Sequence, residues 1–442
     1  MSVRDAVYAF LVAAAVAVVL TPLAARFARR VGAMSYPSAR GLARTPTPTL
    51  GGLAILAGFL LAAVIWTPDV IHLGAPPHPL PGTHEVIRKW PLIGGAVLIA
   101  AIGALDDIYE LKPIVKLGGQ IAAAVVAVIG GATINDLTLP FLTLQFQDGG
   151  AVLAVIWLVA LMNVVNFSDG VDGLAAGVCT IDGAAFALIA FNLQHGASAA
   201  GVLAATTAGA ALGFLVHNRP PAKVFMGDTG ANLLGYLLGI VAIVGTIKTG
   251  AVLALAVPLL ILAVPFLDTS FVVAKRLKYG KRPWDADATH FHHRMAAIGF
   301  SQRKTIAYLY AWTLMFAGVA VALKFVPYDN GQGHYYLGWS IVMGLILLGG
   351  AAASVYLVYV LEIFKFRSLR ALQLRRVNPE ATDSEIDQSV DHDVHTGEFD
   401  AIKLDDTVHR PAERADSAAG QPPSNSPING DKPTGEFDAV KK

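Results

Sequence analysis

Polar and charged side chains gather in four short stretches of an otherwise apolar sequence. The first holds the adjacent carboxylates Asp106 and Asp107, and the second, residues 163–173, reads NVVNFSDGVDG. The third is the sequence FMGD at 225–228, and the fourth is HFHHR at 290–294. Ionisable groups beside long apolar runs are costly and usually mark a function. These stretches therefore hold the candidate site residues.

The residue types in these stretches suit magnesium-dependent phosphoryl transfer. Carboxylate and amide oxygens are hard ligands for Mg²⁺, which takes few protein ligands and completes its shell with water and substrate phosphates. The oxygen donors are Asp106, Asp107, Asp169, Asp172, Asp228, Asn163 and Asn166. Imidazole, ammonium and guanidinium groups bind phosphate oxygens, and these come from His290, His292, His293, Arg294 and Lys116. A metal facing phosphates is the arrangement that phosphoryl transfer uses.

Each stretch also has a structural interpretation. Two carboxylates at a helix end can be solvated interfacial charge, although adjacent carboxylates repel and favour a bound cation or proton. The residues from Asp169 to Gly173 can form a turn between helices, as Asp and Gly often do. Asp228 can cap a helix, which is compatible with binding a metal. Asn163 and Asn166 share one face of a helix, which a turn does not require.

Signatures of several soluble enzyme classes are missing from the sequence. It contains no G-x-x-x-x-G-K-[S/T] phosphate-binding loop, and no dinucleotide-binding glycine motif follows a strand. The stretch at 290–293 is not H-E-x-x-H, which argues against a zinc protease.

The composition predicts an all-α polytopic membrane protein. Of the 442 residues, 55% are hydrophobic and 15% charged, whereas soluble domains carry about 25% charged residues. The mean hydropathy is +0.56. Apolar runs of about 20 residues recur, each long enough to cross a bilayer. The net charge of +1 says nothing about partners, and no nucleic-acid partner is expected. The single cysteine rules out an internal disulfide.

We predict about eleven transmembrane helices. They cover residues 6–25, 50–66, 91–105, 117–134, 151–165, 174–193, 199–216, 230–247, 251–274, 306–326 and 337–364. The first span lacks a cleavable signal pattern and is expected to stay as an anchor. Residues 1–365 form the predicted transmembrane domain. Residues 366–442 are predicted to be a basic juxtamembrane segment followed by a disordered cytoplasmic tail.

The distribution of Lys and Arg predicts the orientation. The loop after the first span holds five arginines and the loop after the ninth holds eight basic residues, whereas residues 135–150 and 194–198 hold none. Basic loops stay in the cytoplasm, so the N-terminus is predicted outside and the C-terminus inside. All four polar stretches then fall on the cytoplasmic side, which predicts one site at that membrane boundary.

The residues resemble the polyprenyl-phosphate N-acetylhexosamine-1-phosphate transferases, which belong to glycosyltransferase family 4. The resemblance covers residues 1–365 and rests on the four stretches, on Lys116 and on PTPTLGG at 46–52. It is greatest to the bacterial undecaprenyl- and decaprenyl-phosphate GlcNAc-1-phosphate transferases. The family implies ten or eleven helices and a cytoplasmic active site. The implied reaction gives polyprenyl diphosphate sugar and UMP, with Mg²⁺ required and Mn²⁺ as a substitute.

The resemblance also implies residue roles. Asn166 and Asp228 match metal ligands, and Asp172 matches a residue that contacts uracil. Lys116, Asn163, His290, His292, His293 and Arg294 match substrate-binding positions. Asp106, Asp107 and Asp169 match catalytic carboxylates, with base and nucleophile roles left open. Where the family carries acidic, histidine and basic residues in its first cytoplasmic loop, this chain has Ser35, Ala43 and Thr49.

The histidine stretch bears on the sugar. Its sequence, THFHHRMAAIG at 289–299, resembles the GlcNAc-type enzymes more than the pentapeptide translocases. We therefore expect UDP-GlcNAc as donor, polyprenyl phosphate as acceptor and a bacterial plasma membrane location, with a homodimer as the favoured assembly. The alternatives are transfer from UDP-MurNAc-pentapeptide or another UDP-HexNAc, a secondary transporter, and an inactive scaffold.

Overall fold

The computed structural model describes a mainly helical protein. The described residues are 1–36, 46–72, 86–134, 136–139, 142–146, 149–192, 196, 197, 199–247, 262, 263, 301–325, 336–359, 382, 384–386, 388 and 389. The chain divides into two compact units, Met1–Asp400 and Ala401–Lys442. The second unit lies outside the described residues, so the predicted division at residue 365 stays a prediction.

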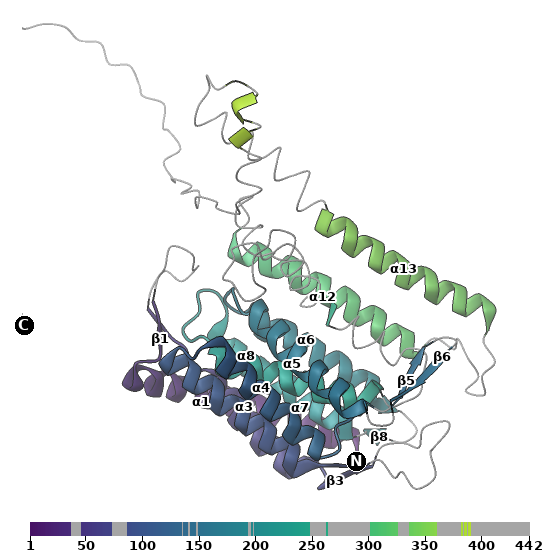
Figure 1. Cartoon of the computed structure of the whole chain (residues 1–442), viewed down its shortest axis with the longest axis horizontal. Helices are drawn as coiled ribbons and strands as arrows, with labels where there is room; N and C mark the ends of the chain where they lie inside the picture. Colours follow the sequence, from purple (N-terminus) through teal and green to yellow (C-terminus); the bar gives the residue numbers. More distant parts are fainter. Residues whose placement is uncertain are drawn as a thin grey trace, which may run out of the picture. The chain divides into compact units, whose positions relative to one another are not determined.

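Helices make up most of the described part of the chain (Figure 1). They are α1 (Val3–Val31), α2 (Gly52–Trp66), α3 (Lys89–Tyr109), α4 (Pro113–Ile129), α5 (Gly150–Ser168), α6 (Leu174–Ala190), α7 (Ala199–Asn218), α8 (Gly227–Ala242), α12 (Gln302–Phe325) and α13 (Leu337–Tyr359). A π-helical turn, η1 (Ile243–Ile247), continues α8.

Four two-stranded antiparallel hairpins complete the described elements. They are β1 (Met34–Ser35) with β2 (Thr47–Pro48), β3 (Val70–His72) with β4 (Val86–Arg88), β5 (Asp136–Leu139) with β6 (Leu142–Gln145), and β7 (Phe191–Asn192) with β8 (Gly196–Ala197). In register, Met34 lies opposite Pro48 and Ile71 opposite Ile87. Each hairpin sits in a connection between two helices, so the bundle itself is all-α.

The helices coincide with the predicted spans wherever those spans are described. Only the ninth span, residues 251–274, falls mostly outside the described residues. Within the described part, six helices are long and apolar enough to cross a membrane, and four shorter helices are apolar. The protein is therefore an all-α, multi-pass membrane protein, as predicted from composition. The total of eleven spans and the orientation stay predictions.

Small residues face inward and large apolar residues face outward on α1. Its buried positions include Ala6, Ala9, Ala13, Ala17 and Ala28. The opposite face exposes large side chains, namely Val7, Leu11, Val19, Leu23 and Phe27. In lipid no hydrophobic force drives large side chains inward, and small residues let helix backbones approach closely. This inverted pattern is the packing expected in a bilayer.

The contact between α1 and α7 shows how close this approach is. A Cβ atom added at Gly209 or Gly213 of α7 would lie 2.2 Å from the carbonyl oxygen of Phe10 or Ala14 on α1. The same pair of helices shares a polar contact. Pro22 of α1 has no N–H to donate to the carbonyl of Val18, and the ring Nε2 of His217 on α7 lies 3.0 Å from that oxygen. The histidine thus satisfies a carbonyl that the proline leaves free.

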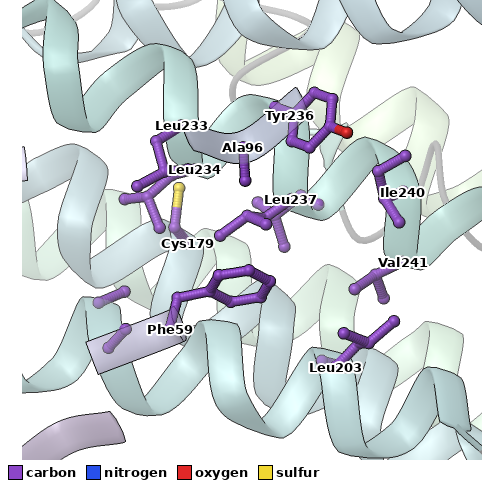
Figure 2. Packing of buried hydrophobic residues seen from close by; sticks show 14 of the residues in the cluster. Phe59, Ala96, Cys179, Leu203, Leu233, Leu234, Tyr236, Leu237, Ile240 and Val241 are labelled. Atoms are coloured by element: carbon purple, nitrogen blue, oxygen red, sulfur yellow. The ribbon is translucent and has the colours of Figure 1, made fainter. Parts of the chain in front are cut away.

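Helix α8 lies at the centre of the packing. Every residue from Thr229 to Ala242 is buried, and α8 contacts α2, α3, α5, α6 and α7. Figure 2 shows its apolar side chains among residues of the surrounding helices, including Phe59, Ala96, Cys179 and Leu203. A helix that is apolar on all sides is expected to be enclosed. The first turn of this enclosed helix carries Asp228.

Candidate active site

Most of the predicted site residues lie in or beside three helix connections at one end of the bundle. Residues 110–112 join α3 to α4, residues 169–173 join α5 to α6, and residues 219–226 join α7 to α8. Asp106 and Asp107 end α3, Lys116 begins α4, and Asp228 begins α8. Asn163, Asn166 and Asp169 occupy the end of α5. The topology therefore brings together residues that lie more than 100 positions apart.

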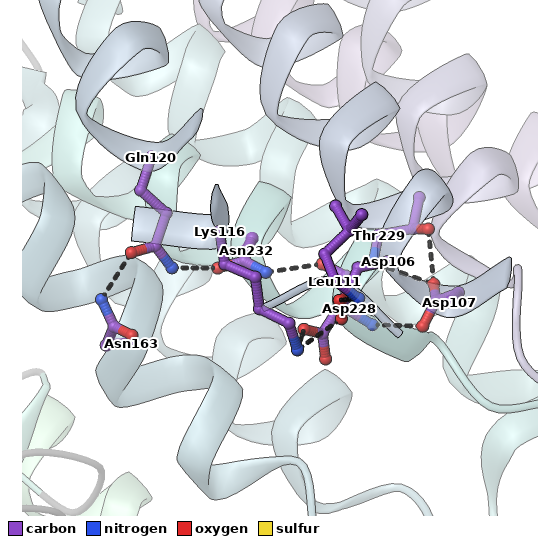
Figure 3. A network of polar contacts seen from close by, with 9 residues as sticks. All are labelled: Asp106, Asp107, Leu111, Lys116, Gln120, Asn163, Asp228, Thr229 and Asn232. Atoms are coloured by element: carbon purple, nitrogen blue, oxygen red, sulfur yellow. Dashed lines mark hydrogen bonds and ion pairs between the residues drawn. The ribbon is translucent and has the colours of Figure 1, made fainter. Parts of the chain in front are cut away.

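Lys116 joins two of the carboxylates. Its Nζ lies 2.5 Å from Oδ2 of Asp106 and 3.0 Å from Oδ2 of Asp228 (Figure 3). Asp106 also fixes the turn that follows its own helix, because its Oδ1 accepts a hydrogen bond of 2.8 Å from the backbone N–H of Leu111. The lysine side chain is about one-third exposed, at 37%. An ammonium group at the edge of a carboxylate pair can therefore reach a phosphate from outside.

Asp107 binds the first turn of α8. Its Oδ1 accepts from the backbone N–H of Asp228 at 2.9 Å, and its Oδ2 accepts from the N–H and hydroxyl of Thr229 at 3.1 and 2.6 Å. The first N–H groups of a helix have no partner within the helix, and a carboxylate there satisfies them and complements the helix dipole. Gly227 has a positive φ of 66°, and a Cβ there would meet the Asp107 carboxylate. Asp107 thus fixes the backbone on which Asp228 sits.

Glycines let α8 approach its neighbours at the same point. A Cβ at Gly52 of α2 would lie 2.2 Å from the nitrogen of Gly230, and one at Gly103 of α3 would lie 2.5 Å from the Cα of Thr229. The backbone N–H groups of Gly51 and Gly52 donate to the carbonyls of the two residues that precede Gly227, Phe225 and Met226. The stretch PTPTLGG is therefore a packing and backbone-bonding surface for the FMGD stretch.

The end of α5 supplies the next groups. The side chain of Asn166 lies beside the carboxylate of Asp228 and interacts with it. Asp169 is half-buried just after α5. Burial, followed by the nearby negative charges of Asp228, Asp107 and Asp172, raises the pKa of Asp169 to about 8. Asp169 therefore holds a proton at neutral pH when no cation offsets these charges.

Asp172 lies in the turn that follows and holds a neighbouring loop. Its Oδ2 accepts from the backbone N–H of Ala222 at 3.0 Å. Asn218 braces the same turn, since its Oδ1 accepts from Gly173 and its Nδ2 donates to the carbonyl of Val224. Tyr310 of α12 donates its hydroxyl proton to the carbonyl of Gly173. The turn at 169–173 is therefore tied to both α7 and α12.

Asn163 belongs to a layer of amides that the sequence analysis did not find. Its Nδ2 donates to Oε1 of Gln120 at 2.8 Å, and Nε2 of Gln120 donates to Oδ1 of Asn232 at 2.8 Å (Figure 3). The signal for Gln120 and Asn232 was available, because each is an amide four residues after a predicted site residue in an apolar helix. Asn218, Thr229 and Tyr310 gave no comparable signal.

The described part of the structure contains eight of the predicted site residues, and the other four lie outside it. Asp106, Asp107, Lys116, Asn163, Asn166, Asp169 and Asp228 form one connected or closely spaced group. Asp172 lies in the adjoining turn. His290, His292, His293 and Arg294 lie outside the described residues, so their predicted place at the site stays a prediction.

The donors present fit a magnesium ion that takes most of its ligands from water and substrate. Asp228 and Asn166 offer a carboxylate and an amide group beside each other, and Asp106 shares Lys116 with Asp228. Among the described residues, no three His, Cys, Asp or Glu side chains are grouped to hold a metal. A small set of hard oxygen donors suits Mg²⁺.

Comparison with known proteins connects this geometry to a family. A family model described as glycosyl transferase family 4 matches residues 90–246. A probable undecaprenyl-phosphate N-acetylglucosaminyl 1-phosphate transferase of Bacillus subtilis is 35% identical over 321 residues, which cover 72% of this chain and 85% of the relative. This chain belongs to glycosyl transferase family 4. The matched stretch contains every described site residue from Asp106 to Asp228.

Further members of glycosyl transferase family 4 share much of the chain. A decaprenyl-phosphate N-acetylglucosaminephosphotransferase of Mycolicibacterium smegmatis is 34% identical, covering 72% of this chain and 81% of the relative. A phospho-N-acetylmuramoyl-pentapeptide-transferase of Streptococcus thermophilus is 34% identical over a shorter stretch, covering 59% and 77%. The resemblance stated from the sequence is confirmed.

Proposed function

We propose that this protein transfers GlcNAc-1-phosphate from UDP-GlcNAc to a polyprenyl phosphate and releases UMP. The observation that carries the proposal is the group of Asp106, Lys116, Asn166 and Asp228, which comes from four helices to one end of the bundle. The relatives named as polyprenyl-phosphate N-acetylglucosaminyl transferases support the donor and the acceptor. The product is the first lipid-linked intermediate of a cell-envelope glycopolymer.

The proposed reaction exchanges one bond at phosphorus. An oxygen of the lipid phosphate attacks the phosphorus that bears the sugar. The bond from that phosphorus to the bridging oxygen breaks, and the bridging oxygen leaves with UMP. Bound Mg²⁺, held by Asp228 and Asn166, would neutralise charge on the diphosphate. Mn²⁺ is the proposed substitute.

The side chains divide the remaining work. Lys116 directs its ammonium group to phosphate oxygens while it pairs with Asp106 and Asp228. Asp106 accepts the proton of a lipid phosphate monoanion, an acid whose pKa of about 6 lies within a few units of that of a carboxyl group. Asp107 has both oxygens engaged by α8, so we assign it to holding Asp228 in addition to its predicted catalytic role. Asp172 contacts the uracil.

The site is proposed to face the cytoplasm of a bacterial plasma membrane. The described basic side chains support this, because most of them lie at the end of the bundle that carries the site. They are Arg26, Arg29 and Arg30 of α1, Lys112, Lys116, Arg219 and Lys223. UDP-sugars are made in the cytoplasm, so the donor would reach this side.

The test uses purified full-length protein with Mg²⁺, radiolabelled UDP-GlcNAc and polyprenyl phosphate. We expect labelled lipid and UMP in equal amounts. Asp228→Asn should lower the rate by at least about 100-fold, because it removes a charge that balances the metal. The matched control is Asp5→Asn, the same change in the N-terminal capping box of α1. Absence of both products with wild-type protein would refute the proposal.

The second candidate differs only in the sugar, and the relative of Streptococcus thermophilus favours it. A panel of UDP-GlcNAc, UDP-GalNAc and UDP-MurNAc-pentapeptide separates the two. We expect the highest kcat/KM with UDP-GlcNAc. A preference for the pentapeptide donor would leave sugar-1-phosphate transfer as the reaction and would change the donor that we assign to this protein. Counter-transport in liposomes without lipid product would instead support the transporter alternative.

A further inference from the structure

Three amide side chains lie one helical turn deeper in the bundle than three of the proposed site residues. The pairs are Lys116 above Gln120 on α4, Asp228 above Asn232 on α8, and Asn166 above Asn163 on α5. Residues three or four apart lie on the same face of a helix. Each amide therefore lies on the same helix face as the site residue it underlies.

The three amides are hydrogen-bonded to one another in a directed chain. Asn163 donates from Nδ2 to Oε1 of Gln120, and Gln120 donates from Nε2 to Oδ1 of Asn232, both at 2.8 Å. Asn232 then donates from Nδ2 to the backbone carbonyl of Asp228 at 2.9 Å. The chain thus starts on α5, crosses α4 and ends on the backbone of Asp228 itself.

The chain is buried and anchored at its far end. Gln120 and Asn232 are each only 5% exposed. Asn163 shares its Nδ2 group with the carbonyl of Val159 on its own helix, at 2.8 Å. Gln120 uses its oxygen toward α5 and its nitrogen toward α8, so only one orientation of its amide satisfies both neighbours. A buried chain of hydrogen bonds that is satisfied in only one arrangement fixes how the helices that carry it are rotated and shifted relative to one another.

The geometry points to Gln120 and Asn232 as positioning residues that set the separation of Lys116, Asn166 and Asp228. This inference rests on the proposed function of the site. Neither amide contacts substrate in this assignment. They act because α4, α5 and α8 cannot shift or rotate relative to one another without breaking a buried hydrogen bond. A misplacement of about 1 Å in a catalytic group can lower a rate by roughly 100-fold.

The first experiment measures the separation without using activity. A water-soluble carbodiimide joins an amine to a carboxylate only when the two are in contact, so it should link Lys116 to both Asp106 and Asp228. The link to Asp106 joins α3 to α4, which are already connected by residues 110–112. It therefore serves as an internal reference. Mass spectrometry gives the ratio of the Asp228 link to the Asp106 link.

Gln120→Leu keeps most of the side-chain volume and removes both hydrogen bonds. We expect the cross-link ratio to fall at least threefold, and kcat of the monodisperse protein to fall roughly 10- to 100-fold. Gln120→Glu keeps the acceptor for Asn163 and lacks the donor for Asn232, so it should lower the ratio as well. Asn232→Ala removes the same link from the α8 side and replaces Gln120→Leu if that variant does not fold.

The matched control is Thr206→Val on α7. Thr206 is fully buried and polar, but its hydroxyl bonds only the carbonyl of Val202 in its own helix. It should change neither the ratio nor kcat. An unchanged ratio in Gln120→Leu and Asn232→Ala would overturn the inference. If wild-type protein transfers no sugar from any donor, the proposed function fails, while the ratio still decides whether the amides position the three residues.

Discussion

At the scale of single residues, the carboxylate of Asp107 illustrates how one side chain can serve structure and chemistry together. It satisfies three donors at the start of α8. A base would need a lone pair free for a proton, whereas a cap needs only to accept. The two roles respond differently to substitution. Asparagine keeps one acceptor oxygen for these donors, and alanine keeps none.

We therefore expect Asp107→Asn to retain more activity and stability than Asp107→Ala. The alanine variant should lose about 0.5–2 kcal/mol of stability, the usual cost of removing a helix cap. The measurements are the melting temperature in detergent and the transfer rate. Asp5→Asn, in the capping box of α1, is the control for replacing a capping carboxylate by an amide. Equal and complete inactivity of both Asp107 variants, with normal melting temperatures, would instead show that the carboxylate acts as a base.

Asp169 makes stability depend on pH in a direction opposite to that of most carboxylates. Its pKa is about 8 in the folded protein, against 3.8 for an unperturbed group. Between these values the folded state binds more protons than the unfolded state, so stability falls as the pH rises. With metal removed by EDTA, the wild-type melting temperature should decrease from pH 5 to pH 8.5. Asp169→Asn should flatten that decrease, and parallel curves for the two proteins would contradict the assignment.

At the scale of elements, the start of α8 depends on glycines in its neighbours. A Cβ at Gly103 would lie 2.5 Å from backbone atoms of Thr229 and 2.6 Å from the carbonyl of Asp228. Gly103→Ala must therefore displace α8 or α3, and overpacking of this kind costs about 1–3 kcal/mol. We expect a lower melting temperature and at least a tenfold lower transfer rate.

Gly118 provides the matched control for this substitution. It is also a helical glycine, on the adjacent helix α4, but nothing lies within 4 Å of the position where its Cβ would be. Gly118→Ala should leave the transfer rate unchanged and can raise stability by up to about 1 kcal/mol through helix propensity. Similar losses in the two variants would mean that the approach of α3 to α8 does not control the site.

The helices themselves could be predicted from the sequence because a bilayer demands about 20 apolar residues for each crossing. The predicted span 199–216, for example, coincides with α7 (Ala199–Asn218). The predicted site residues were found because carboxylates and amides stand out beside apolar runs. The contact partners could not be found in this way. That Asp107 caps α8, 121 residues later, depends on how α3 and α8 pack.

The hydrogen-bond partners in the amide chain also could not be predicted from the sequence. Gln120 and Asn232 are visible in the sequence as polar residues in apolar helices, but their pairing depends on the rotation of α4 against α8. Asn232 sits at a position that could equally have faced lipid. Conversely, the glycines of PTPTLGG were noted only as part of a resemblance. Their physical role, a close backbone approach to Phe225 and Met226, required coordinates.

At the scale of the whole molecule, the two ends of the bundle differ in charge. The end that carries the site includes Arg26, Arg29 and Arg30 near the end of α1 and the basic residues of the connections at 110–112 and 219–226. The other end includes Arg4, Arg88 and Lys89, and Lys89 is buried against Asp69 and two backbone carbonyls. Loops rich in Lys and Arg are retained in the cytoplasm. The charge distribution thus predicts that Lys112 lies inside the cell and Asp69 outside.

Single cysteines can test this orientation because the chain has only one natural cysteine. Cys179 is buried, and Cys179→Ala gives a background without thiols. Asp69→Cys and Lys112→Cys each place a thiol at an exposed position of the described chain, one at each end. A membrane-impermeant maleimide applied to intact cells should label position 69 and spare position 112. Inside-out vesicles should reverse the pattern, because only the cytoplasmic ends of the helices then face the reagent. Labelling of position 112 in intact cells would place Asp106, Lys116 and Asp228 at the outer surface, where no UDP-sugar is supplied, and would exclude the proposed reaction.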